Sequence, residues 1–213
     1  MMYLLRNPVV IRMTFVQSTF VALLVLALFW KVADTTRPIL VEDIFKDTFN
    51  WMGLSFMLTS NIMIPSIQNV VMQMPMQVPV FKRELMNHMY TPTAYFFART
   101  LSGILIQVCA PILMTLIIFF GLGLPVTAFT FLNFFTNTVQ VALVGCAIGY
   151  MCGLVFEDDN LARGFSMFMT LVFMLVSGSL NIALNYPIVI DQLQYVSPNR
   201  YSVETFFRIL SDG

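Results

Sequence analysis

The fold is decided by TLSGILIQVCAPILMTLIIFFGLGLPVTAFTFLNFFTNTVQVALVGCAIGYMCGLVF, residues 100–156, a stretch without a single charged side chain. An α-helix rises about 1.5 Å per residue and the hydrocarbon core of a bilayer is about 30 Å thick, so one membrane span needs about 20 apolar residues. The stretch is too long for one span and long enough for two. Near its middle, Gly121-Leu-Gly-Leu-Pro125 supplies residues that favour a turn. We therefore predict two membrane helices joined by a tight hairpin.

Three further stretches lack charge, namely Met13–Trp30, Thr48–Phe81 and Gly164–Ile190. Of the 213 residues, 58% are hydrophobic and 10% are charged, against about 45–50% and about 25% in soluble domains. This composition excludes a soluble enzyme and predicts an all-α, multi-pass membrane protein with about five transmembrane helices. The formal net charge is zero, so nucleic acid is not an expected partner.

Charges and prolines set the expected boundaries of these spans. We place the spans at about residues 8–30, 48–70, 95–120, 126–154 and 164–184, so that residues 1–186 form a five-helix transmembrane domain. The charged residues between the first two spans indicate a loop over 31–47, and residues 157–160 indicate a second polar loop. Pro65, Pro75 and Pro79 are expected to end or kink the second helix, because proline removes a backbone donor.

The chain after Pro187 is too charged to span the membrane again. Ser197 and Pro198 are typical of a helix start, with serine as the N-cap and proline in the first turn. Arg200, Glu204 and Arg208 then follow at intervals of four residues on one helix face. Residues 187–213 are therefore predicted to form an amphipathic interfacial segment that ends in a short helix.

The sequence contains no constellation that would carry catalysis. An ATP-binding loop needs a glycine-rich turn followed by lysine and serine or threonine, and none occurs. Cys109, Cys146 and Cys152 lie in apolar stretches without a CxxC pair, so we interpret them as packing residues. The acidic residues 157–159 favour a solvated loop over a cation site. The prediction is a protein that is not an enzyme, with no catalytic residues, no metal and no cofactor in this chain.

The polar side chains inside the predicted spans are neutral. Such groups commonly form hydrogen bonds between membrane helices. They are also suited to line a wall for an amphipathic ligand, together with 21 Phe and 16 Met, whose flat or flexible side chains accept varied partners. The sequence leaves both interpretations open for Asn61, Gln107, Asn133, Asn137 and Gln140.

Three motifs in register resemble the transmembrane domain of G-subfamily ABC exporters, the pleiotropic-drug-resistance type. The first is Phe81-Lys-Arg-Glu84, followed by Met89-Tyr90 and by Ala94-Tyr95-Phe96-Phe97-Ala98-Arg99. The second is Ser177-Gly178, then Pro187, then Gln194-Tyr195-Val196-Ser197-Pro198-Asn199-Arg200-Tyr201. The third is the hairpin at residues 121–125. Together they cover about residues 5–207.

The resemblance implies two groups of functional residues. In such exporters the first motif lies on the cytosolic side against the ATP-binding domain, and the substrate cavity lies between the second and fifth helices of two halves. Residues that would couple to an ATPase or another partner are Lys82, Arg83, Glu84, Glu157, Asp158 and Asp159. Residues that would face the substrate cavity are Asn61, Thr170, Phe173 and Met174.

Family members carry an ATPase domain before the first helix and a sixth helix after the fifth, and neither is recognised in this sequence. We therefore state two functional hypotheses. The first is the permease subunit of an ABC exporter of lipid-like or amphipathic substrates, in a homodimer or heterodimer, with ATP and Mg on a separate chain. The second is an exporter-derived accessory subunit of a large membrane complex without transport activity, for example a respiratory assembly. The sequence does not distinguish between a location in the plasma membrane and one in the mitochondrial inner membrane.

Overall fold

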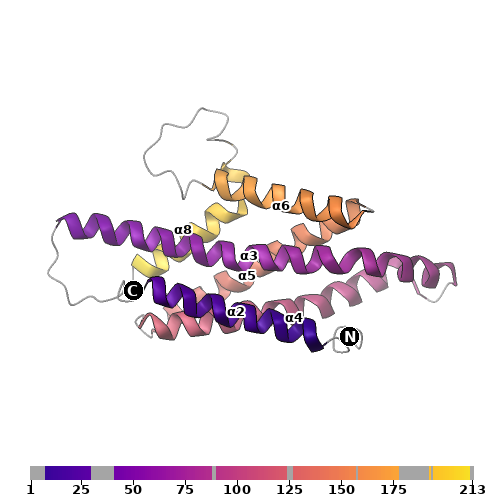
Figure 1. The fold of residues 1–213 in the computed structure, drawn as a ribbon, viewed down its shortest axis with the longest axis horizontal. Coiled ribbons are helices and arrows are strands. Elements are labelled where there is room, and N and C mark those ends of the chain that lie inside the picture. The colour runs from indigo at the N-terminus through magenta and orange to yellow at the C-terminus, as the bar shows by residue number, and fades with distance from the viewer. Residues whose placement is uncertain are drawn as a thin grey trace.

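A computed structural model describes residues 8–29, 41–87, 90–123, 127–156, 158–177, 192 and 194–211. These residues form helices and no β-strand. The elements are α2 (Pro8–Leu28), α3 (Val41–Met86), α4 (Pro92–Gly121), α5 (Ala128–Val155), α6 (Asp159–Val176), the 3₁₀ turn η1 (Gln194–Val196) and α8 (Pro198–Ser211). In Figure 1, α3 crosses the middle of the molecule, with α2 and α4 on one side and α6 on the other. The predicted all-α membrane class is confirmed.

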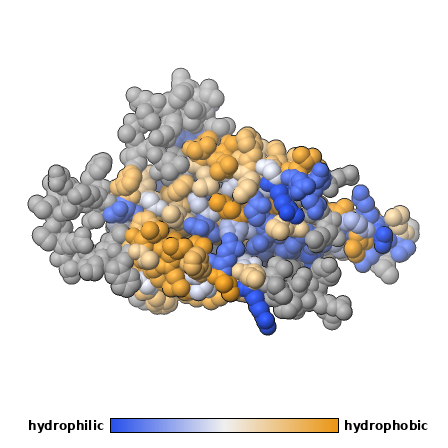
Figure 2. Space-filling view, viewed as in Figure 1, coloured by the Kyte–Doolittle hydropathy of each residue, from blue (hydrophilic) through white to orange (hydrophobic). Residues whose placement is uncertain are grey.

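Three helices within the described ranges are each long and apolar enough to cross a membrane, namely α4, α5 and α6. The apolar part of α2, Arg12–Leu28, is shorter. Helix α3 is long enough, but its serine, asparagine and glutamine side chains lower its hydropathy. The assignment of α2 and α3 as spans stays a prediction. Figure 2 shows apolar side chains over the outer face of α6, where Met167, Phe168 and Leu171 are exposed.

Helix α3 corrects the predicted second span and the loop before it. It runs without interruption from Val41 to Met86, through the three prolines that were expected to end or kink it and through residues 41–47, which were expected to be a loop. Ile62, Met63 and Ile67, which flank Pro65, are buried in the core. We infer that packing at these residues outweighs the cost of about 3 kcal/mol for a proline inside a helix.

The other helix boundaries lie close to the predicted ones, with one correction. Gly123 has a φ of 68° at the hairpin between α4 and α5, a conformation that glycine adopts without strain. Helix α6 starts at Asp159, inside the loop predicted at residues 157–160, because the carboxylate of Asp158 accepts a hydrogen bond from the backbone N–H of Asn160 at 3.0 Å. The predicted end of the fifth span, near residue 184, lies outside the described residues.

Helix α5 approaches α3 closely through a row of glycines. Gly145, Gly149 and Gly153 follow one another at intervals of four on α5. A β-carbon added at Gly149 would lie 2.8 Å from the carbonyl oxygen of Ile67, and one at Gly153 would lie 2.8 Å from Cβ of Met74. Small residues at this spacing let two backbones approach in a membrane. The contact makes α5 the main neighbour of α3.

Helix α8 packs into the same core as the membrane helices. Val203, Phe206 and Leu210 are buried. The ring centroid of Phe206 lies 4.9 Å from that of Phe134, which lies 5.7 Å from that of Phe119. Ser197 was predicted to cap α8. Its hydroxyl instead donates to the carbonyl oxygen of Phe173 at 2.7 Å, so it ties the start of α8 to α6. The interfacial position of residues 187–213 stays a prediction.

Candidate functional site

The end of α3 and the start of α4, residues 81–87 and 90–99, form an elbow with a stacked aromatic core. The ring centroid of Tyr95 lies 4.6 Å from that of Phe81 and 5.3 Å from that of Tyr90. The hydroxyl of Tyr90 donates to a carboxylate oxygen of Glu84. Arg99 Nε donates to Gln77 Oε1 at 2.6 Å, which joins α4 to α3. These contacts hold the last turn of α3 and the first turns of α4 in one arrangement.

The elbow presents its charges in two ways. Lys82 and Arg83 are exposed, whereas Glu84 is half-buried and holds Tyr90. Desolvation and the hydrogen bond to Glu84 raise the pKa of the Tyr90 hydroxyl to about 12, because both disfavour the phenolate. The hydroxyl therefore remains a donor at neutral pH. Of the three predicted coupling residues in the elbow, Lys82 and Arg83 are exposed and Glu84 braces the elbow.

Ionisation of Tyr90 gives a first prediction. The folded-state pKa of about 12 lies above the ordinary value of 10.0, so the contribution of the Tyr90–Glu84 contact is present below pH 10 and is lost as the pH rises through 12. We expect the ultraviolet absorbance titration of the wild type, minus that of Tyr90→Phe, to show one tyrosine with a midpoint near pH 12. A midpoint near pH 10 would contradict the contact.

The second predicted coupling group lies at the start of α6. Asp158 is exposed and caps the helix, Asp159 is half-buried in its first turn, and Glu157 lies outside the described residues. Figure 1 shows the start of α6 at the same end of the molecule as the end of α3. The structure thus places exposed cations of one group and carboxylates of the other at one end.

The four residues predicted to face a substrate cavity lie on α3 and α6. Gln68 Nε2 donates to Ser166 Oγ at 3.3 Å, and the two helices run in opposite directions (Figure 1). Asn61 lies seven residues before Gln68 on α3, and Phe173 lies seven residues after Ser166 on α6. Because the helices are antiparallel, Asn61 and Phe173 lie at the same level. Thr170 is buried, and its hydroxyl donates to the carbonyl oxygen of Ser166 at 2.7 Å. Asn61, Phe173 and Met174 are half-buried.

Several neutral polar residues form hydrogen bonds between helices, which was one of the two interpretations that the sequence left open. Thr115 Oγ1 donates to Thr138 Oγ1 at 2.9 Å between α4 and α5. Asn137 Nδ2 donates to the carbonyl oxygen of Ser202 at 3.1 Å between α5 and α8. The amide of Asn61 behaves differently, because it donates to the carbonyl oxygen of Met57 in its own helix at 2.8 Å. Its surface is therefore not committed to a neighbouring helix.

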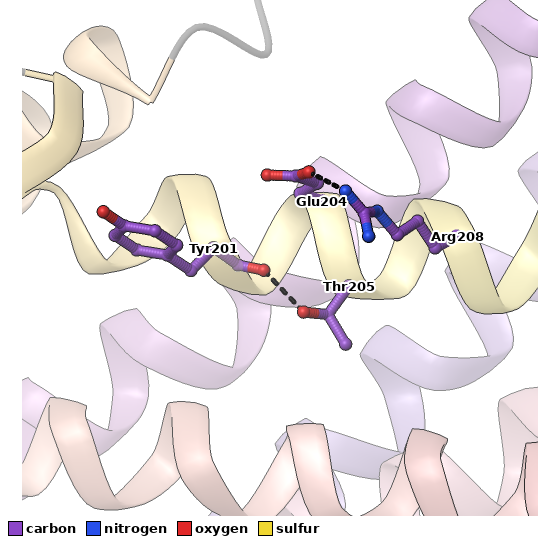
Figure 3. A network of polar contacts seen from close by, with 4 residues as sticks. All are labelled: Tyr201, Glu204, Thr205 and Arg208. Atoms are coloured by element: carbon purple, nitrogen blue, oxygen red, sulfur yellow. Dashed lines mark hydrogen bonds and ion pairs between the residues drawn. The ribbon is translucent and has the colours of Figure 1, made fainter.

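A groove of about 640 Å³ lies between α5 and α8, and the sequence did not predict it. Asn133 and Gln140 of α5 line it, together with residues of α8. On α8, Arg208 Nη2 lies 2.6 Å from a carboxylate oxygen of Glu204, and Thr205 Oγ1 donates to the carbonyl oxygen of Tyr201 at 2.7 Å (Figure 3). The polar spacing along α5 was visible in the sequence, but its meeting with α8 was not.

The family model described as ABC-2 type transporter matches residues 1–210. Protein white of Drosophila melanogaster is 22% identical over 200 residues, which are 94% of this chain and 28% of that protein. ABC transporter G family member 24 of Dictyostelium discoideum is 25% identical over 201 residues, 94% of this chain and 17% of that protein. Protein scarlet of Drosophila melanogaster is 25% identical over 203 residues, 94% of this chain and 29% of that protein. The chain thus spans less than a third of the length of these relatives.

Proposed function

The chain belongs to the ABC-2 type transporter family, and from this premise we propose that it is the permease subunit of an exporter of lipid-like or amphipathic substrates. It is an integral membrane protein, and its relatives include ABC transporters of the G family. In this proposal a separate chain binds ATP and Mg and hydrolyses the ATP. The permease itself catalyses no reaction.

The observation that supports this proposal best is the elbow. Helix α3 has 46 residues, which is about 69 Å at 1.5 Å per residue, more than twice the hydrocarbon thickness of about 30 Å. One end of it therefore has room to stand clear of the lipid. That end carries exposed Lys82 and Arg83 on a braced aromatic turn. A rigid, charged turn outside the membrane is suited to receive a motor chain.

Charge reversal at Arg83 tests the docking role. We expect an ATP-binding chain to co-purify with the wild-type protein from its native membrane in mild detergent. Arg83→Glu should lower the amount recovered at least about tenfold, because like charges placed opposite each other at an interface cost several kcal/mol. The measurement is quantitative mass spectrometry of the purified complex. Arg12→Glu is the matched control, since Arg12 is also an exposed arginine and lies on α2, outside the elbow.

Two outcomes would overturn this proposal. An intact complex after Arg83→Glu would show that the elbow is not part of the docking surface. Recovery of many membrane subunits and no ATP-binding chain would instead favour the accessory, non-transporting subunit of a large assembly.

The same proposal assigns the substrate wall to Asn61, Thr170, Phe173 and Met174, facing a second copy or a related chain. Its test is thiol labelling in intact membranes with a water-soluble maleimide, in a chain whose exposed Cys109 is replaced by serine. Cysteine at Asn61 or Met174 should react, because a chamber that passes substrate admits water. Cysteine at Leu171, an exposed position on α6, should face lipid and stay unlabelled. If the cysteines at all three positions were equally protected from the maleimide, the proposed water-accessible chamber would be contradicted.

A further inference from the structure

A second cavity, of about 280 Å³, lies beside the elbow, where α3, α4 and α5 meet. Its walls are mostly apolar and include Met74, Phe81, Tyr95 and Leu154. The volume is at the lower end of the range for small-molecule sites, which is about 300–1,000 Å³. The cavity is therefore suited to a narrow apolar group such as one acyl chain.

Arg99 is the charged side chain among the described residues that line this cavity. Arg99 donates through Nε to the neutral amide of Gln77 at 2.6 Å. Among the residues that the structure describes, no carboxylate lies within ion-pair distance of Arg99. The remaining guanidinium N–H groups are donors that suit an anion with two oxygens.

The residue after Arg99 lines the same cavity. The hydroxyl oxygen of Thr100 is buried without a hydrogen bond to any described residue. A buried hydroxyl without a partner costs about 1–3 kcal/mol, so this part of the wall is not fully satisfied by the described residues.

The position of Arg99 along α4 indicates the source of such an anion. The residues after it, from Thr100 to Phe120, carry no charge and span about 31 Å, which matches the hydrocarbon core. Arg99 therefore lies at the end of the apolar stretch, at the level of the lipid headgroups, and Phe96 and Phe97 just before it are exposed. Arginines at the ends of membrane helices reach the headgroup region, where the guanidinium group meets lipid anions. The molecules that carry anions to this level are lipids.

We propose that the cavity binds one acyl chain of an anionic lipid from the surrounding bilayer, with the lipid's phosphate or carboxylate oxygens paired with Arg99. Because Phe81 and Tyr95 belong both to the cavity wall and to the stacked core of the elbow, an occupied cavity braces the elbow. This site is separate from the substrate wall on α3 and α6.

The test is native mass spectrometry of the purified protein in mild detergent, titrated with three probes. Oleoyl lysophosphatidate carries one chain and a phosphate, monooleoylglycerol carries the chain alone, and glycerol 3-phosphate carries the phosphate alone. We expect the lysophosphatidate to bind at least about tenfold more tightly than either of the others. Equal binding of glycerol 3-phosphate would overturn the lipid source, and equal binding of monooleoylglycerol would overturn the role of the charge.

Two sets of variants locate the site. Arg99→Gln should weaken binding of the lysophosphatidate about tenfold, Arg99→Lys should weaken it less because it keeps the charge but not the two-donor geometry, and Arg12→Gln should leave it unchanged. Leu154→Trp should fill the cavity and reduce binding, whereas Leu171→Trp should not. The leucines are matched, because both are 56% exposed. Each variant is first checked for a monodisperse elution profile and wild-type helical content. Wild-type affinity in both folded Arg99→Gln and Leu154→Trp would overturn the proposal.

Discussion

Replacement of Gly149 by leucine is expected to destabilise the protein by about 3 kcal/mol or more and to reduce sharply the yield of monodisperse protein. A β-carbon at this position would lie 2.8 Å from a backbone oxygen of α3 and 2.8 Å from Cβ of Val70. Neither atom is the far end of a flexible side chain, so the helices themselves must move apart. Overpacking of a tight contact typically costs 1–3 kcal/mol, and more where the backbone must shift.

The measurement is the free energy of unfolding in mixed detergent micelles, obtained by titration with dodecyl sulfate. Gly164→Leu is the matched control, because Gly164 also lies in a membrane helix and no heavy atom lies within 4 Å of its added β-carbon. This control distinguishes the effect of forcing α3 and α5 apart from any general effect of replacing glycine by leucine in a helix. If Gly149→Leu unfolded at the same detergent fraction as Gly164→Leu, the close approach of α3 and α5 would be refuted.

Truncation of Phe206 to alanine is the second change with a large expected effect. Its side chain is fully buried, and its ring packs on Phe134, so its removal leaves a cavity in the core shared by α4, α5 and α8. Substitution of a buried phenylalanine by alanine costs about 3–5 kcal/mol. We expect a loss of about 3 kcal/mol or more in the same unfolding titration. Phe168→Ala should change little, since Phe168 is exposed on α6.

The result for Phe206 also decides how the C-terminal helix belongs to the fold. If α8 merely lay on the bilayer surface, Phe206→Ala would weaken its attachment without altering the unfolding of α3, α4 and α5. Loss of stability throughout the protein would show that α8 is part of one cooperative unit. A local effect alone, seen as faster hydrogen exchange only in α8, would contradict the shared core.

The membrane helices could be read from the sequence because lipid imposes a local rule. Uninterrupted apolar length marks a span, and glycine with proline marks the turn at residues 121–125. The continuity of α3 could not be read in the same way. The local cost of Pro65 is visible in the sequence, whereas the compensating contacts come from residues far along the chain.

The same distinction holds for the candidate sites. The charges of Lys82 and Arg83 stand in the sequence next to one another, but the position of Asn137 against Ser202 joins residues 65 positions apart. One missed signal was local. The spacing of Gly145, Gly149 and Gly153 is a known pattern of close helix contact, and it predicts that this face of α5 meets another helix closely, although it does not identify α3 as the partner.

The unbroken run of α3 has a mechanical consequence. A rod of about 69 Å that tilts by about five degrees around one end displaces the other end by about 6 Å. Helix α3 is continuous over this length and contacts α5, α6 and α8, so no loop separates the charged tip from the far end of the molecule. A push of a few ångströms at Lys82 and Arg83 is therefore expected to reach α8 through the helix itself, reduced by any bending at Pro65, Pro75 and Pro79.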